Sequence, residues 1–278
     1  MSAASVSASH IKNTSPLRYP GGKTRACKLL LELVKNNFDT TQFDCVLSPF
    51  FGGGSFEFKL QEELGWSVKA NDGFAPLICF WRAAKNNNAE LVDRVRAIYA
   101  TVSKEQLQAL RSALTTQSDV DQAASVFAIN RCSFSGATLS GGFSDGAIQG
   151  RFTPSSIQRL ANLNLSQVDF WNQDFEVFLK EQWQHNTFVF LDPPYYLEKG
   201  SKLYGTSGDM HQTFDHTKLS MLLKGKKGWL MTYNNCEWVR NAYSDCLILD
   251  AEWAYGMNKS KKSSEVVIIP RSAHSPHP

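Results

Sequence analysis

The chain has 278 residues, of which 42% are hydrophobic and 20% are charged, and its formal net charge is +3. This composition allows a large core, and it excludes a disordered chain and a strongly cationic DNA-wrapping protein. It does not exclude a local basic face that binds nucleic acid. No apolar run reaches the length of a membrane span, and the six cysteines lack C-x-x-C spacing, so we expect reduced thiols in a cytoplasmic protein that binds no membrane.

The first part of the chain alternates strands and helices. Residues 1–14 are rich in Ser and Ala, and we expect a flexible leader there. An apolar run at 43–48 predicts a buried strand, which is followed by a Gly-rich turn, a helix over 56–64, a strand over 66–70 and a helix over 77–84. Strand, Gly-rich turn, helix, strand and acidic residue is the order that opens a doubly wound α/β sheet.

The middle of the chain has a different pattern. Residues 89–99, 104–114 and 120–131 have helical periodicity, and residues 133–152 are rich in Gly and Ser, which predicts a long functional loop. Strand patterns return at 168–171, 188–191 and 228–233, and residues 246–254 with 265–270 predict a terminal hairpin. We therefore expect a core over 15–100 and 166–270, a mostly helical insertion over 101–165 and a flexible tail over 271–278.

The most specific motif, D-P-P-Y at Asp192 to Tyr195, directly follows the strand at 188–191. Pro193 and Pro194 fix the turn and remove two backbone donors. An acidic residue at the carboxyl end of a buried parallel strand lies where α/β proteins bind ligands. The Asp192 carboxylate and a peptide carbonyl can accept hydrogen bonds from an amino group while the Tyr195 ring stacks, which predicts a clamp for a planar base. The alternative is a rigid turn with an incidental acid.

A second motif, P-F-F-G-G-G-S over 49–55, lies between a predicted strand and a predicted helix. Asp72 ends the next strand, where nucleoside cofactor folds place the acid that binds ribose hydroxyls. Because the glycines do not fit G-x-G-x-x-G, S-adenosylmethionine suits the motif better than a dinucleotide. A tight strand-to-helix turn and a helix N-cap are the alternatives for the glycines and for Asp72.

Residues 18–24, R-Y-P-G-G-K-T, end like a phosphate-binding loop. The first glycine of such a loop is replaced by Leu17 and no apolar strand precedes the motif, so we reject a nucleoside triphosphatase. What remains is a glycine turn that opens a helix at Thr24, with Lys23 placed to meet a carboxylate.

Together these segments resemble the Dam-type, alpha-ordered family of adenine-specific DNA methyltransferases. The resemblance spans residues 15–270 and keeps the family's motif order. The matching segments are Tyr19 to Lys23 for W/Y-x-G-G-K, residues 49–55 for the Gly-rich motif, Asn71-Asp72 for the acidic motif and Asp192 to Tyr195 for D-P-P-Y. Weaker similarities are found at Asn130-Arg131, at residues 173–175 and at residues 231–235.

The resemblance implies a Rossmann-like, S-adenosylmethionine-dependent methyltransferase sheet with an inserted, mostly helical DNA-recognition domain. It also implies site-specific methyl transfer to N6 of a flipped-out adenine in double-stranded DNA. The residues expected to be catalytic are Asp192, Pro193, Pro194 and Tyr195. Those expected to bind the cofactor are Tyr19, Gly21, Gly22, Lys23, Phe51, Gly52, Gly53, Gly54, Ser55, Asp72, Asp174, Phe175 and Asp192.

DNA contacts are expected from six residues of the insertion and of the terminal hairpin loop: Asn130, Arg131, Arg151, Lys259, Lys261 and Lys262. The histidines lack the spacing of metal ligands, so no metal is expected. We expect a monomer in the cytoplasm of a bacterium or of a virus-infected cell. The resemblance allows for a cognate restriction endonuclease that acts on the same site.

Three alternatives stay open. The first is methylation of cytosine at N4, although such family enzymes usually have Ser at the position of Asp192. The second is a catalytically silent DNA-binding module on the same scaffold. The third is methylation of a protein amide, for which the family motif usually begins with Asn.

Overall fold

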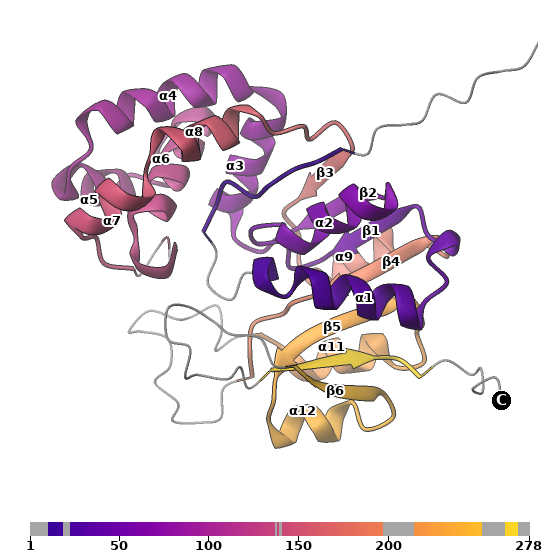
Figure 1. Ribbon diagram of the computed structural model, residues 1–278. Helices are drawn as coiled ribbons and strands as arrows, with labels where there is room; N and C mark the ends of the chain where they lie inside the picture. Colours follow the sequence, from indigo (N-terminus) through magenta and orange to yellow (C-terminus); the bar gives the residue numbers. More distant parts are fainter. Residues whose placement is uncertain are drawn as a thin grey trace, which may run out of the picture.

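A computed structural model describes residues 11–18, 23–136, 138, 141–196, 214–251 and 265–271. Within them, seven strands form one sheet in the order β3-β2-β1-β4-β5-β7-β6 (Figure 1). The strands are β1 (Cys45–Ser48), β2 (Ser67–Asn71), β3 (Val168–Trp171), β4 (Thr187–Leu191), β5 (Trp229–Asn234), β6 (Leu247–Ala251) and β7 (Glu265–Ile269). All pairings are parallel except those of β7, which is antiparallel to β5 and β6. The doubly wound prediction is confirmed, as is the antiparallel pairing of the last two predicted strands.

Helices pack on both faces of this sheet, because successive side chains of the central strands point to opposite faces. Val46 and Phe188 join a core with one set of helices, and their neighbours Leu47 and Val189 join a second core with another set. The first set is α1 (Cys27–Asn37), α2 (Ser55–Leu64) and α3 (Ala75–Asn86), and the second is α9 (Phe175–Gln182), α11 (His216–Leu223) and α12 (Glu237–Ala242). The 3₁₀ turn η1 (Lys23–Arg25) precedes α1, and η2 (Thr40–Gln42) precedes β1.

A helical cluster lies beside the sheet (Figure 1). It contains α4 (Asn88–Thr101), α5 (Lys104–Ser112), α6 (Asp119–Cys132), α7 (Asp145–Arg151) and α8 (Pro154–Ala161). Its central helix is α6, whose residues 123–132 are all buried and which packs against α3, α4, α5 and α7. The three helices predicted in this region are confirmed. α4 lies in the cluster, although the boundary predicted at residue 101 assigns it to the core.

The continuous loop predicted over 133–152 is wrong. The 3₁₀ turn η3 (Phe134–Gly136) begins this stretch and α7 ends it. α7 forms despite its two glycines because Ser144 accepts a hydrogen bond from the Ala147 N–H and the Ala147 side chain is buried. Local capping and tertiary burial thus outweigh a composition that is typical of loops.

The predicted flexible leader is also wrong at its C-terminal end. Asn13 is buried, its Oδ1 accepts a hydrogen bond from the Asn164 N–H at 2.9 Å, and its Nδ2 donates to the Asn164 carbonyl at 2.8 Å. The rest of the leader up to residue 10 and the tail from residue 272 lie outside the described residues. All six cysteines are free thiols, as predicted. No helix in the described part of the chain has the length and apolarity to cross a membrane.

Candidate active site

The candidate active site lies at the carboxyl ends of β1 and β4. These strands are parallel neighbours, and the chain continues from β1 to β2 on one side and from β4 to β5 on the other. Doubly wound sheets bind ligands at such a switch point. The Gly-rich loop after β1 therefore meets the D-P-P-Y segment after β4 at the same edge of the sheet.

Asp72, which directly follows β2, organises the Gly-rich loop. Its Oδ2 accepts a hydrogen bond from the Gly52 N–H at 3.0 Å, and its Oδ1 accepts one from the Phe74 N–H at 2.9 Å. Burial raises the pKa of the Asp72 carboxyl, and these two N–H donors lower it. Gly54 adopts φ 66°, and a Cβ on it would lie 2.3 Å from the Phe51 ring. Only glycine fits this position, because both the backbone conformation and the close approach exclude a side chain.

The other residues predicted to bind the cofactor differ in exposure. Phe51 is a core residue whose ring packs edge-on against Trp81, with ring centroids 5.3 Å apart. Its side chain therefore supports the loop from the core. Gly53 is buried, and Ser55 is half-buried and accepts a hydrogen bond from Thr24 Oγ1 at 3.1 Å. Tyr19, Gly21 and Gly22 lie outside the described residues.

The segment after β3 joins the loop after β1. The Asn71 side chain pairs with both backbone groups of Gln173, at 2.8 Å and 3.1 Å, and also donates to the Pro49 carbonyl at 3.1 Å. Asp174 caps α9 by accepting a hydrogen bond from the Glu176 N–H. The Phe175 ring lies 5.7 Å from that of Phe50. The weak motif at 173–175 is thus placed next to the Gly-rich loop.

Two donors hold Asp192 by the same carboxylate oxygen. Lys23 Nζ lies 2.9 Å from Oδ1, and Thr232 Oγ1 donates a hydrogen bond to Oδ1 at 2.6 Å. Within the described residues, Oδ2 receives no protein donor. The carboxylate is therefore oriented with one oxygen fixed by the protein and the other available to a ligand.

The backbone after Asp192 is fixed from β5. Asn234 Oδ1 accepts a hydrogen bond from the Tyr196 N–H, and Asn234 Nδ2 donates to the Tyr196 carbonyl, both at 2.9 Å. The Tyr196 ring stacks on Trp238 with centroids 4.7 Å apart. Tyr195 is half-buried, and its hydroxyl lies 3.3 Å from Lys23 Nζ. The Tyr195 ring is thus held in place and only half-buried. Pro193 is buried and Pro194 half-buried in the same turn.

Buried acids surround the Lys23–Asp192 pair. Lys23 is 4% exposed, and its Nζ also lies 3.7 Å from Glu265 Oε2. Glu57, on α2, accepts a hydrogen bond from Ser48 Oγ at 2.5 Å. Burial raises the pKa of Glu57 to about 7 and that of Glu265 to about 8. Lys23 thus lies as a buried cation among carboxyl groups, and its contact with a carboxylate agrees with the prediction from its motif.

Asn130 and Arg131, which the sequence predicts as DNA contacts, are buried at the end of α6. Asn130 pairs with the backbone N–H and carbonyl of Arg18, at 2.8 Å and 2.7 Å. Arg131 donates to the carbonyls of Pro16 and Arg151, and burial lowers its pKa to about 10. Both side chains thus bind the protein's own backbone. Arg151 is half-buried, and Lys259, Lys261 and Lys262 lie outside the described residues.

The sequence analysis assigned no role to Thr232, Asn234 and Glu265 at the site, nor to Phe134 after α6, although Thr232 and Asn234 lie in the segment 231–235 that it gave as a weaker similarity. Thr232 and Glu265 are polar residues in otherwise apolar strands, W-L-M-T-Y-N and E-V-V-I-I, and that contrast is a readable signal. Asn234 is the last residue of the same strand as Thr232, and only the fold shows that it pairs with Tyr196. Phe134, two residues after α6, is 70% exposed, which is unusual for a large aromatic side chain.

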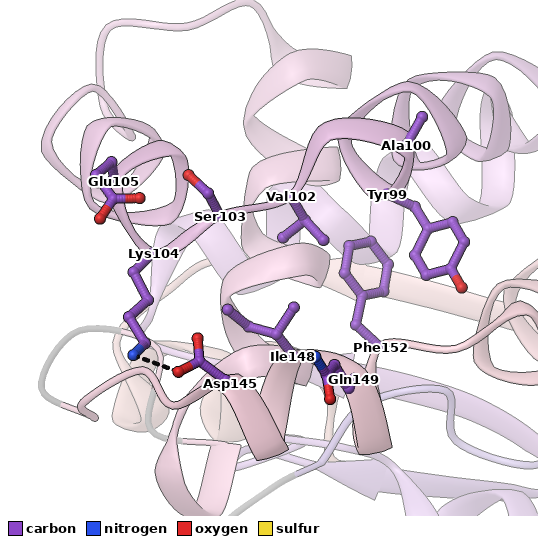
Figure 2. Close-up of a pocket in the computed structure, with 10 residues that line it drawn as sticks. All are labelled: Tyr99, Ala100, Val102, Ser103, Lys104, Glu105, Asp145, Ile148, Gln149 and Phe152. Carbon is purple, nitrogen blue, oxygen red and sulfur yellow. Dashed lines mark hydrogen bonds and ion pairs between the residues drawn. The ribbon is translucent and has the colours of Figure 1, made fainter.

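A cleft of about 620 Å³ lies within the helical cluster, between the end of α4, the start of α5 and α7 (Figure 2). The Lys104–Asp145 ion pair, 2.8 Å long, closes one side of it. Tyr99, Ile148 and Phe152 contribute apolar surface to it. It shares no residue with the candidate active site. The described residues contain no cluster of side chains suited to a metal ion.

Comparison with known families agrees with the geometry. The family model of D12 class N6 adenine-specific DNA methyltransferases matches residues 19–257, which include the Gly-rich loop, the helical cluster and the D-P-P-Y segment. The chain belongs to this family. It is an enzyme that methylates adenine in DNA at N6, and the cytosine and silent-module alternatives are not supported.

Proposed function

We propose that Asp192 and Tyr195 clamp a target adenine at the β1–β4 switch point, with S-adenosylmethionine bound over the Gly-rich loop. The carboxylate of Asp192 carries this proposal, because Lys23 and Thr232 occupy Oδ1 and leave Oδ2 for a substrate donor. The amino group of adenine has two N–H donors in one plane. Asp192 Oδ2 accepts one of them, and the Pro193 carbonyl accepts the other.

The residues present fit S-adenosylmethionine. The glycine at 54 lets the loop turn tightly over the Phe51 ring, and the buried carboxyl of Asp72 supplies an acceptor for ribose hydroxyls. Phe50, which is half-buried and packs against Phe175, offers aromatic surface near the loop for an adenine ring. When bound, the cofactor supplies a methyl group on a cationic sulfur, so the reaction requires no metal.

The chain's own residues then act on the amino nitrogen. Its lone pair is delocalised into the adenine ring, and hydrogen bonds to Asp192 Oδ2 and to the Pro193 carbonyl favour a more tetrahedral nitrogen that can attack. When bound, S-adenosylmethionine would supply the methyl group to this nitrogen, and its sulfur would keep the electron pair of the broken sulfur–carbon bond. The nitrogen afterwards loses one proton to Asp192 or to water. The rate enhancement comes from alignment and fixed electrostatics.

The target adenine reaches this clamp by leaving the duplex. An Asp192 carboxylate at the end of a buried strand cannot reach N6 of a stacked base, so we propose that the base is flipped out and stacks on Tyr195. Stacking on an aromatic ring offsets part of the cost of unstacking.

The helical cluster is the proposed DNA-recognition unit. Because Asn130 and Arg131 bind backbone groups, we propose that they position the residues after α6, and that exposed groups there, such as Phe134, meet the DNA. Phosphate contacts from Lys259, Lys261 and Lys262 remain part of the proposal. So do a monomeric enzyme, its action in the cytoplasm and a cognate restriction endonuclease, which the sequence alone suggests.

One experiment tests the clamp. Unmethylated genomic DNA is incubated with the wild-type protein or with Asp192→Ala, and the nucleosides are measured by mass spectrometry. We expect N6-methyl-2′-deoxyadenosine from the wild type only, with DNA affinity largely kept in the variant because phosphate contacts dominate affinity. Near-normal turnover by Asp192→Ala would refute the mechanism. Sequencing of the same DNA with methylation-sensitive chemistry would identify the recognition site.

A further inference from the structure

The acid that begins β7 lies beside the clamp, and the proposed chemistry does not use it. Glu265 is 4% exposed, and the four residues that follow it in β7 are buried Val and Ile. A carboxyl group at the start of such a strand adds no packing and is costly to bury. Its Oε2 lies 3.7 Å from Lys23 Nζ, the same nitrogen that contacts Asp192 Oδ1 at 2.9 Å.

Lys23 is shared between these two carboxyl groups. It comes from η1, Asp192 from the end of β4 and Glu265 from β7, so three separate parts of the chain meet at one ammonium group. Glu57 adds a further buried acid that interacts electrostatically with Asp192. Several ionised carboxylates around one buried cation would be strongly unfavourable.

We propose that Glu265 is a positioning residue for methyl transfer, because its carboxyl group holds the Lys23 ammonium against Oδ1 of Asp192 and so keeps Oδ2 directed at the target amino group. This inference rests on the proposed role of Asp192. As a neutral acid, Glu265 keeps Oε2 3.7 Å from Lys23 Nζ and leaves the full positive charge to Asp192. When ionised, it competes with Asp192 for that charge.

The protonation state follows from the surroundings. Burial is the main cause that raises the pKa of Glu265, to about 8, and Asp192 raises it further while Lys23 lowers it. Glu265 is therefore mostly protonated near neutral pH and loses its proton in mildly alkaline solution. The competition for Lys23 then begins, and we expect the reaction to slow.

The neighbouring strands contribute no other ionisation in this range. On β5, Asn234 lies opposite Glu265 and is neutral, and burial raises the pKa of the adjacent Tyr233 far above its usual value. On β6, Ala251 lies opposite Glu265, and the adjacent Asp250 is ion-paired with Arg240. Near Glu265, the described residues also place Lys23, the Asp192 and Glu57 carboxyl groups and the Tyr195 hydroxyl.

The test measures single-turnover methyl transfer from saturating S-adenosylmethionine to unmethylated genomic DNA between about pH 6 and pH 9.5. For the wild type we expect a plateau and then a loss of about tenfold by pH 9, as for one ionisation near pH 8. Glu265→Gln keeps a neutral acceptor of the same shape, so its rate should stay level through pH 9. Glu57→Gln, a matched change of a buried acid that does not contact Lys23, should keep the alkaline decline.

A second measurement separates positioning from simple stability. Glu265→Asp shortens the side chain by one methylene group, and Glu265→Ala removes the acceptor. Each should lower kcat about tenfold or more at pH 7.5 while the KM for DNA and the affinity for S-adenosylmethionine change less than twofold. Circular dichroism and thermal unfolding check that each variant is folded. If Glu265→Ala does not fold, the kcat of Glu265→Asp decides the test.

Two results would overturn the proposal: a Glu265→Gln profile that declines like that of the wild type, or wild-type kcat in Glu265→Asp. If the wild-type rate shows no alkaline decline, the claim that ionisation of Glu265 slows the reaction is wrong. None of these outcomes bears on Asp192 itself, whose role is tested by Asp192→Ala. Failure of the inference and failure of the proposed function are therefore distinguishable.

Discussion

The side chain of Asn130 pairs with both backbone groups of Arg18, 112 residues earlier in the chain. Its Oδ1 accepts a hydrogen bond from the Arg18 N–H, and its Nδ2 donates to the Arg18 carbonyl and, at 3.0 Å, to the Gly136 carbonyl. This contact joins the helical cluster to the segment that leads into Lys23. Three other asparagines hold a distant peptide in the same reciprocal way: Asn13 on Asn164, Asn71 on Gln173 and Asn234 on Tyr196.

We expect Asn130→Ala to lower both stability and activity. It leaves the partly buried backbone groups of Arg18 and the buried carbonyl of Gly136 without their partner, which costs about 1–3 kcal/mol of unfolding free energy. It also frees the segment before Lys23, so kcat should fall. Asn13→Ala is the matched control, because it removes a clamp of the same kind away from the active site. It should destabilise to a similar degree while the kcat of the folded enzyme stays within twofold of wild type, as measured by denaturant unfolding and tritium transfer. Equal kcat values for the two variants would argue against a link between Asn130 and the site.

Gly136→Ala should be more damaging than the loss of one hydrogen bond. Gly136 adopts φ 80°, and a Cβ on it would lie 1.9 Å from the Arg18 carbonyl oxygen, so the peptide of Arg18 must move. Gly225→Ala provides the comparison, because Gly225 has φ 72° and nothing lies within 4 Å of its Cβ position. Gly225→Ala should cost about 1 kcal/mol from backbone strain alone. Similar losses of thermal stability in the two variants would show that the contact with Arg18 is easily relaxed.

The sheet could be predicted from the sequence because its strands are apolar runs between turn residues. Each predicted strand overlaps the observed one, and the helix over 56–64 ends at Gly65, which adopts φ 73°. The motifs also predicted which loops meet, because a doubly wound sheet places the ends of β1 and β4 together. The pattern does not predict α7, because its two glycines are typical of a loop. Capping and burial stabilise the helix all the same.

The surroundings of Asp192 could be predicted only in part. Lys23 was expected to meet a carboxylate from its motif, and it does. Thr232 contacts Asp192 and Glu265 contacts Lys23 because the pairing of β4, β5 and β7 brings together strands that are far apart in the chain. Asn130 and Arg131, in contrast, were predicted to contact DNA, and the structure gives them another role. Polar residues in a recognition region suggest base contacts, but on a fully buried helix end they satisfy backbone groups instead.

Asp72 is expected to affect both the loop and the cofactor. Asp72→Ala removes the acceptor for the Gly52 and Phe74 N–H groups and the proposed partner of the ribose hydroxyls. Loss of hydrogen bonds to a charged group costs about 1.5–3 kcal/mol, so the Kd for S-adenosylmethionine should rise about 10- to 100-fold. Isothermal titration gives the affinity, and circular dichroism confirms the fold. An unchanged Kd would leave Asp72 with a purely structural role.

The buried Glu57 should make stability decrease as pH rises. Its pKa is raised to about 7 in the folded chain, so the folded state keeps a proton that the unfolded chain releases above about pH 4.5. The stabilisation is complete below that pH and is lost as the pH rises through about 7. Glu57→Gln should therefore gain about 3 kcal/mol on the wild type between pH 4.5 and pH 8 in urea unfolding. Glu181→Gln, a change of an exposed acid, should show no comparable gain. A constant difference between Glu57→Gln and the wild type would indicate that Glu57 ionises normally.

Variants of Tyr195 distinguish the stacking of its ring from the hydrogen bonding of its hydroxyl at the proposed clamp. Its hydroxyl lies 3.3 Å from Lys23 Nζ, while its ring is half-buried at the position proposed for the flipped base. Tyr195→Phe keeps the ring face and loses only a contact of Lys23, which Asp192 still holds, so it should keep most of the activity. Tyr195→Ala removes the stacking surface, worth about 1–3 kcal/mol per base, and should lower kcat/KM by about tenfold or more. A fluorescent adenine analogue at the target position would report extrusion in both variants. If Tyr195→Phe were as inactive as Tyr195→Ala while the analogue still left the duplex, the hydroxyl and not the ring face would be the essential group, through its hold on Lys23.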